Sequence, residues 1–244
     1  MAEDFFDEPV AAAYDTDSAA MFGSDVVEPV VEFLTANAGP GGALELGIGT
    51  GRIALPLAGR GIAVDGIDLS EAMVERLRTK PGGSAIDVTV GDFARVRTGS
   101  RYSLVYLVFN TIMNLTTQRA QVDCFRNTAR HLRPGGRFVV EVEVPDLQRL
   151  SPGERFQPFH IDEGHWGLNE YDLPTQGLVS HHLRFVDGGT RRNSVPFRYV
   201  WPTELDLMAE IAGMTLVGRW GGWQREPFTA DSRGHVSVWE TPSR

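Results

Sequence analysis

Short apolar runs recur along the first 144 residues and are separated by longer amphipathic stretches. Runs of about four to eight apolar residues bounded by glycine or polar residues are typical of buried strands, and apolar positions three or four apart are typical of helices. Strands alternating with helices form a parallel sheet covered on both faces, so the pattern predicts an α/β fold. The predicted strands lie near residues 43–47, 62–67, 86–90, 103–109 and 136–144.

Two helices are predicted from apolar spacing. Val26, Val30 and Leu34 indicate a helix in the first forty residues, and Pro29 leaves the position of its start open. A second helix is predicted over residues 118–132, ended by the proline and two glycines that follow. Its apolar stripe consists of Val122, Phe125, Ala129 and Leu132.

The pattern changes after residue 144. Apolar and polar residues alternate over 179–185 and again over 195–201, on either side of Asp187-Gly188-Gly189, which predicts an antiparallel hairpin. The next helix is predicted at Thr203, because Thr203 and Asp206 have the spacing of a capping box.

The chain is therefore predicted to have three parts. Residues 1–144 are predicted to form a helical cap and the main core, and residues 145–200 an antiparallel insertion. Residues 201–244 are predicted to complete the core sheet with a helix and two strands, near 214–220 and 235–240.

Composition narrows the classes of function. With 42% hydrophobic residues, the 244-residue chain can form a sizeable core, and no apolar run is long enough to span a bilayer. The net charge is -9 without a basic stripe, so nucleic-acid binding is not expected. The single cysteine permits no internal disulfide, and the acidic N-terminus does not fit a secretory signal, so a cytoplasmic protein is expected.

The glycine-rich turn after the first predicted strand carries the strongest functional signal. Glu45 precedes Gly47, Gly49 and Gly51, which occupy alternate positions. Glycine adopts backbone dihedrals that other residues avoid and lets a ligand approach main-chain N–H groups. In a dinucleotide site the third glycine comes one residue later, and a carboxylate here would repel a pyrophosphate. The same carboxylate would bind an amine.

Four motifs in this order resemble class I S-adenosylmethionine (SAM)-dependent methyltransferases. The resemblance implies SAM as the cofactor and a Rossmann-like, seven-stranded, mostly parallel sheet with helices on both faces, plus the antiparallel insertion after the fifth strand. The motifs are Glu45-x-Gly47-x-Gly49-x-Gly51, the strand that ends at Asp68, Gly91-Asp92-Phe93 and the run from Leu132 to Val140.

The resemblance also assigns residues to parts of SAM. Glu45 is expected at the amine, Asp68 at the ribose, and Asp92 with Phe93 at the adenine. Tyr14 lies in a segment similar to the one that closes over SAM, and its ring is expected to cap the sulfonium. For Tyr14 and Phe93, packing in the core is the alternative. The expected cofactor-binding residues are Tyr14, Glu45, Gly47, Gly49, Gly51, Asp68, Leu69, Met73, Asp92 and Phe93.

The segment after the fourth predicted strand bears on the acceptor. Phe109-Asn110-Thr111-Ile112 lacks the Asn/Asp-Pro-Pro-aromatic turn of enzymes that methylate nucleobase amines, and no carboxylates cluster there for a metal. It is similar to the same segment of amino-sugar N-methyltransferases and natural-product O-methyltransferases. A small-molecule acceptor is therefore expected, without a metal. An amine nitrogen is slightly favoured, because a hydroxyl more often needs a general base and none is obvious.

Glu143 and His181 are the catalytic candidates on the acceptor side. Glu143 shares a strand face with Glu141 and lies nearer the carboxyl end, where open α/β sheets bind ligands. A salt bridge to Arg155 or Arg184 is the structural alternative. His181 lies on the apolar face of the hairpin, where a hydrogen-bonded core histidine is the alternative.

Other functions stay open at this point. A nicotinamide-dependent oxidoreductase is disfavoured by the glycine spacing and Glu45, and a SAM-binding protein without transfer activity fits the same motifs. Phe197, Tyr199 and Trp201 share one face of the hairpin, which makes that face a candidate homodimer interface.

Overall fold

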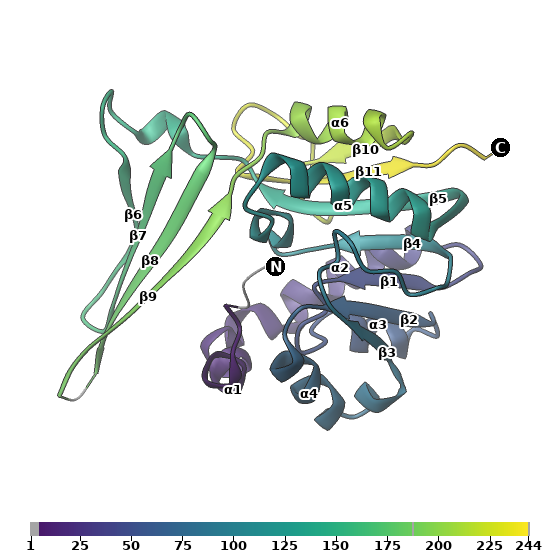
Figure 1. Cartoon of the computed structure of the whole chain (residues 1–244), viewed down its shortest axis with the longest axis horizontal. Coiled ribbons are helices and arrows are strands. Elements are labelled where there is room, and N and C mark those ends of the chain that lie inside the picture. The colour runs from purple at the N-terminus through teal and green to yellow at the C-terminus, as the bar shows by residue number, and fades with distance from the viewer. Residues whose placement is uncertain (1–4, 187, 244) are drawn as a thin grey trace.

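The computed structural model describes residues 5–186 and 188–243 (Figure 1). The strands of its larger sheet are β1 (Ala43–Leu46), β2 (Val64–Asp68), β3 (Asp87–Val90), β4 (Tyr102–Leu107), β5 (Leu132–Glu143), β10 (Thr215–Trp220) and β11 (Gly234–Glu240). They are ordered β10-β11-β5-β4-β1-β2-β3. The five strands from β5 to β3 are parallel, and β11 and β10 continue the sheet in antiparallel fashion. The predicted seven-stranded, mostly parallel sheet is confirmed.

Helices cover both faces of this sheet. The α-helices are α1 (Glu8–Asp17), α2 (Ser24–Asn37), α3 (Ala54–Gly59), α4 (Glu71–Thr79), α5 (Gln118–His131) and α6 (Pro202–Ile211). Side chains of α2 and α3 pack on one face, and those of α5 and α6 pack on the other. In the described part of the chain, none of the helices has the length and apolar character needed to cross a membrane.

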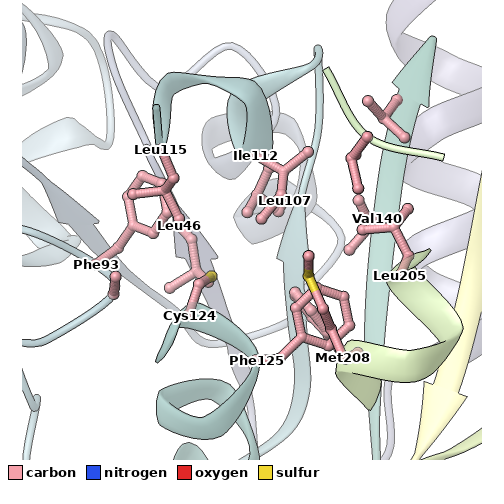
Figure 2. Packing of buried hydrophobic residues seen from close by; sticks show 14 of the residues in the cluster. Leu46, Phe93, Leu107, Ile112, Leu115, Cys124, Phe125, Val140, Leu205 and Met208 are labelled. Atoms are coloured by element: carbon pink, nitrogen blue, oxygen red, sulfur yellow. The ribbon is translucent and has the colours of Figure 1, made fainter. Parts of the chain in front are cut away.

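The core on the α5 and α6 side gathers side chains from neighbouring strands. Figure 2 shows Leu46, Leu107 and Val140 of the sheet beside Phe125 of α5 and Met208 of α6. All five are at most 2% exposed. Burial of such side chains contributes about 1.5–3 kcal/mol each, which makes this layer a main source of stability.

The buried stripe of α5 differs from the predicted one. Phe125 is fully buried as predicted, but Cys124 is fully buried beside it, whereas Val122 and Ala129 lie only at the margin of the core. Leu132 belongs to β5, because α5 ends at His131, ahead of the predicted stop. The stripe is rotated because α5 packs against α6 as well as the sheet.

The insertion after β5 is a second, four-stranded antiparallel sheet. It consists of β6 (Phe156–Ile161), β7 (His165–Asp172), β8 (Gly177–Val186) and β9 (Gly189–Arg198), paired in that order. The predicted hairpin is β8 with β9, and Asp187 of its turn lies outside the described residues. The first two strands were not predicted, because Pro158 interrupts one and polar residues the other.

The face predicted as a homodimer interface packs within its own chain. Tyr199 is only 3% exposed, and the half-buried Phe197 packs against the main core, so most of this face is covered by its own chain. Both belong to the segment where β9 returns to the α/β core. Trp201, just after it, is partly exposed at 38%.

The start of α6 also differs from the prediction. Trp201 is its N-cap and Pro202 its first residue, so Thr203 lies inside the helix and no capping box forms. A proline suits the first helical turn, where its missing N–H costs nothing. Asp206 instead pairs with Arg219 at 2.7 Å and accepts a hydrogen bond from the Trp239 indole at 3.0 Å.

A buried arginine fastens the insertion to the core. Arg198, at the end of β9, is 4% exposed. Its guanidinium pairs with Glu204 of α6 at 2.7 Å and donates to the Gln121 side chain of α5. One side chain therefore joins the antiparallel sheet to both helices of the α5 and α6 layer.

We expect Arg198→Met to lower the free energy of unfolding by about 3–5 kcal/mol, because removal of one partner leaves the other charge buried without compensation. Arg119→Met, on the exposed face of α5, is the matched control and should change stability by less than about 0.5 kcal/mol. Urea unfolding measures both variants. Equal stability of the two would show that Arg198 does not anchor the insertion.

Candidate active site

The glycine-rich turn lies between β1 and α3, at the carboxyl edge of the parallel strands. Gly47 and Gly51 have φ values of +72° and +82°, in the left-handed region. A Cβ on Gly51 would lie 2.4 Å from a methyl of Leu77, and one on Gly47 would lie 2.6 Å from Cγ2 of Thr111. Both positions therefore require glycine for backbone conformation and for space.

Asp68 ties this turn to the end of β2. Its Oδ2 accepts a hydrogen bond from the Gly49 N–H at 2.7 Å, and its Oδ1 accepts one from the Ser70 N–H at 2.9 Å. Ser70 in turn caps α4 by accepting a hydrogen bond from the Met73 N–H at 3.3 Å. The carboxylate thus orders the turn and the start of the next helix together.

A cavity of about 450 Å³ opens at this edge. Its volume is in the range typical of sites for small molecules and cofactors. Its walls include eight of the ten residues expected to bind SAM, which are Tyr14, Gly47, Gly49, Asp68, Leu69, Met73, Asp92 and Phe93. The structure therefore brings these eight side chains and turns together around one space.

Glu45 and Gly51 are not among the lining residues. Gly51 shapes the turn from behind, where it packs on Leu77. Glu45 is 3% exposed and accepts a hydrogen bond from the Tyr106 hydroxyl at 2.9 Å. Burial raises the pKa of Glu45 from its usual 4.5 to about 8, against the opposing effects of that hydrogen bond and the Arg52 charge.

The N-terminal helix closes over the cavity. Asp15 of α1 accepts a hydrogen bond from Thr50 at 2.6 Å and pairs with Lys80 at 2.5 Å, so α1 is held on the glycine-rich turn. Tyr14 lines the cavity, and its ring contacts Phe6 edge to face with centroids 6.2 Å apart. Burial raises the pKa of the Tyr14 hydroxyl, which keeps the phenol neutral.

Several cavity residues were not predicted. They come from the segment before α1, from the segments after β2, β3 and β4, and from the insertion. For those that follow a strand, position at the carboxyl edge would have been the only signal. Asp92 was expected, but the cation beside it, Arg95, at 3.5 Å, was not. The unpredicted lining residues are Phe5, Phe6, Ser70, Arg95, Thr111, Asn114, Leu115, Thr116, Thr117, Ala120 and Pro196.

A second cavity of about 240 Å³ lies at the same edge, beside the turn after β4. Phe109, Asn110, Glu141 and Glu143 are among its walls. The Glu143 carboxyl opens to solvent, but the protein around it desolvates it and, together with the Asp146 charge, raises its pKa.

The salt bridges considered for Glu143 do not form. Arg155 pairs with Glu170, at 3.8 Å, and Arg184 pairs with Asp17 of α1, at 3.4 Å. Glu143 therefore keeps its carboxyl at the edge of the sheet, where its charge contributes to raising the pKa of Tyr171.

His181 lies apart from Glu143, within the antiparallel sheet. Its ring nitrogens hydrogen-bond to Ser194 at 2.8 Å and to Glu170 at 3.2 Å, and it lines neither of the two cavities. Among the residues that the structure describes, no three His, Cys, Asp or Glu side chains are grouped as metal ligands.

A parallel sheet whose first strand leads into a glycine turn, and whose second strand ends in a carboxylate at a cavity, defines a Rossmann-like nucleotide-binding protein. Comparison with known proteins specifies the class. A family model described as a methyltransferase domain matches residues 43–136. The CcbJ methyltransferase from Streptomyces caelestis is 39% identical, with a TM-score of 0.79 and 88% of each chain covered. The chain belongs to the class I SAM-dependent methyltransferases.

Two further relatives extend this comparison. The cypemycin N-terminal methyltransferase of a Streptomyces species is 28% identical over 200 residues, which cover 81% of this chain and 82% of that protein. CalS10 from Micromonospora echinaspora, a SAM-bound amino pentose methyltransferase, shares the fold with a TM-score of 0.68 at 21% identity, and 98% of each chain is covered. The protein is therefore a SAM-dependent methyltransferase, and the oxidoreductase and non-enzymatic alternatives are set aside.

The buried Glu45 carboxyl gives the protein without SAM a specific pH dependence. The unfolded chain loses this proton near pH 4.5, whereas the folded protein keeps it until about pH 8. The free energy of unfolding should therefore fall with rising pH in this window, by about 1.4 kcal/mol per pH unit from this group.

Urea unfolding at pH 5, 6, 7 and 8 tests this. Glu45→Gln cannot ionise, so its stability relative to the wild type should increase across the series. Parallel stability profiles for the two proteins would show that Glu45 is ionised in the folded state throughout.

Proposed function

We propose that the enzyme methylates an amine nitrogen of a small-molecule acceptor such as an amino sugar. The observation that carries this proposal is the Glu143 carboxyl, which stands without either of the expected arginine partners at the carboxyl edge, beside the turn that follows β4. A carboxylate there can bind a protonated amine and take its proton, since an amine must lose that proton before it can accept a methyl group. The names of CalS10 and the cypemycin enzyme support amine chemistry among similar proteins.

The cavity fits SAM in size and in polarity. When bound, SAM supplies a methyl group activated by a sulfonium. We assign the amine of its methionine end to Glu45, and its carboxylate to Arg52, whose guanidinium has a single long hydrogen bond, to the Met21 carbonyl at 3.3 Å, among the interactions described for it. Arg52 was not predicted, although it ends the glycine motif. Its charge acts on both Glu45 and Tyr14, which supports this assignment.

We assign the remaining expected residues to the rest of the molecule. Asp68 and Asp92 offer carboxylates to the ribose and to the adenine amine, and Phe93 offers an aromatic ring beside the base. Leu69 and Met73 provide apolar contacts to the adenosine. The Tyr14 ring is assigned to the sulfonium, whose positive charge is attracted by an aromatic face.

On the acceptor side, the residues align the acceptor and remove water from around it. They do not supply a strong nucleophile. Methyl transfer is an in-line displacement, so most of the acceleration comes from holding the acceptor against the methyl group and excluding water. The nitrogen lone pair forms the new C–N bond as the S–CH₃ bond breaks, and Glu143 accepts the proton that the amine loses. The raised pKa of Glu143 improves it as a base near neutral pH.

O-methylation of a natural-product hydroxyl is the second candidate. The same carboxylate could serve a hydroxyl, which needs a base more than an amine does. Experiment distinguishes an amine acceptor from a hydroxyl acceptor. Binding of nucleic acid is not expected, because of the acidic net charge of -9.

We expect Asp68→Ala to weaken SAM binding at least tenfold. It removes charge-assisted hydrogen bonds worth about 1.5–3 kcal/mol, and it also releases the Gly49 N–H that orders the turn. Calorimetric titration with SAM and S-adenosylhomocysteine measures the change, and both ligands should lose affinity alike. Unchanged affinity would show that Asp68 does not contact the nucleoside.

Turnover of labelled SAM with amino sugars, amino acids, peptides with a free N-terminus and phenols tests the acceptor class. We expect transfer to an amine. Transfer only to phenols would replace this proposal by O-methylation.

The two catalytic candidates are compared with the best acceptor of that panel. Glu143→Gln should reduce turnover by about tenfold to a hundredfold, with SAM affinity within about threefold of the wild type. His181→Ala is the second variant to compare, because the wild-type His181 ring hydrogen-bonds within the antiparallel sheet. Loss of turnover in His181→Ala but not in Glu143→Gln would show that the acceptor binds at the insertion instead.

A further inference from the structure

The turn after β4 has a main-chain conformation that L-amino acids rarely adopt. Phe109 and Asn110 have φ values of +57° and +59°, in the left-handed region. Consecutive non-glycine residues persist there only where the surrounding structure holds them, and such strain is concentrated at functional sites. The groups that hold this turn therefore bear on what the site does.

The Glu141 carboxylate is the main support of the turn from β5. Its Oε2 accepts a hydrogen bond from the Phe109 N–H at 2.8 Å, and its Oε1 accepts one from the Trp223 indole at 3.0 Å. A second contact comes from the same strand, because the Asn110 Oδ1 accepts a hydrogen bond from the Glu143 N–H at 2.7 Å. Both left-handed residues are thus fastened to β5.

The other partner of Glu141 is itself fixed. The Trp223 ring packs edge to face on Phe33 of α2, with centroids 5.3 Å apart. Phe33 is 3% exposed in the core. The carboxylate therefore connects the turn to a rigid helix through two hydrogen bonds, one on each oxygen.

The turn leads directly into the wall of the larger cavity. Thr111, the next residue, lines that cavity, and its methyl lies where a Cβ on Gly47 would come within 2.6 Å. The Phe109 ring lies under the Arg52 guanidinium, 5.0 Å from its centroid. A change in this turn would thus alter the contacts around the methionine end of the SAM site.

We propose that Glu141 is a positioning residue for methyl transfer, and this inference rests on the proposed function. It accepts the Phe109 N–H, holds the left-handed turn, and so sets where Phe109, Asn110 and Thr111 stand beside the methyl group. It lines the smaller cavity but acts through the turn, because its two carboxylate oxygens accept hydrogen bonds from Phe109 and Trp223. The carboxyl of Glu143, two residues along the same strand, is assigned to the acceptor.

The geometry requires two acceptor oxygens. In Glu141→Gln one oxygen can accept from Phe109 or Trp223, but the amide NH₂ then faces the other N–H donor. In the double variant Glu141→Gln with Trp223→Phe the indole donor is gone, so the glutamine oxygen is free for Phe109. The double variant should therefore recover activity that Glu141→Gln loses.

We expect Glu141→Gln to lower kcat about tenfold to a hundredfold, because misplacement by about 1 Å has effects of this size. The acceptor KM and the SAM Kd should stay within about threefold. Glu240→Gln is the matched control, because Glu240 pairs with Arg137 at the opposite end of β5, at 3.1 Å, and should keep wild-type kcat. The double variant should regain at least about threefold over Glu141→Gln.

A measurement that needs no acceptor tests Glu141 even when no compound of the acceptor panel is methylated. SAM labelled with ¹³C on its methyl group, bound to each protein, reports the surroundings of the methyl carbon by NMR. We expect its resonance to shift in Glu141→Gln and to match the wild type in Glu240→Gln.

Three outcomes would overturn the inference. They are wild-type kcat with an unchanged methyl resonance in Glu141→Gln, no recovery in the double variant, and parallel losses of kcat, SAM affinity and thermal stability, which indicate a purely structural role. A wild-type enzyme that methylates no amine would instead refute the proposed function, while the methyl resonance still tests Glu141.

Discussion

The site depends on the hydrogen bonds that the Asp68 carboxylate accepts from two main-chain N–H groups. One belongs to Gly49 of the glycine-rich turn and the other to Ser70 at the start of α4. The turn and the helix follow different strands, so their relative position is fixed at the point where β1 and β2 end side by side. A charge-assisted hydrogen bond is worth about 1.5–3 kcal/mol, enough to keep the turn in its left-handed conformation.

Near Asp68, the protein keeps the polar Glu45 carboxyl away from water. Glu45 is buried and accepts hydrogen bonds from the Tyr106 hydroxyl and the Ala54 main chain, and burial raises the pKa of its carboxyl to about 8. Such a group is costly in a folded protein unless a ligand or partner compensates it. Helix α1, held on the glycine-rich turn by Asp15, contributes Tyr14 to the wall of the cavity.

Two carboxylates two residues apart on β5 have different surroundings. Glu141 accepts a main-chain N–H and an indole N–H, whereas Glu143 donates its own main-chain N–H to Asn110 and leaves its carboxyl at a cavity edge. The difference comes from position along the strand. Glu141 is opposite Val236 of β11 and near Trp223, whereas Glu143 is at the last pair of the strand.

The sequence by itself determined the sheet, the glycine turn and the cofactor. Glu45, the glycines, Asp68 and Asp92 are close in the chain to the strands that carry them, so local pattern places them, and eight of the ten expected residues line one cavity. Tertiary structure decided what depends on distant contacts. Strand β7 forms by pairing with β8, strand β6 forms by pairing with β7, and Tyr199 is covered by the main core. The pairing of Glu141 with Trp223 spans 82 residues. Local periodicity carries no information about such contacts, because they are set by how the whole chain packs.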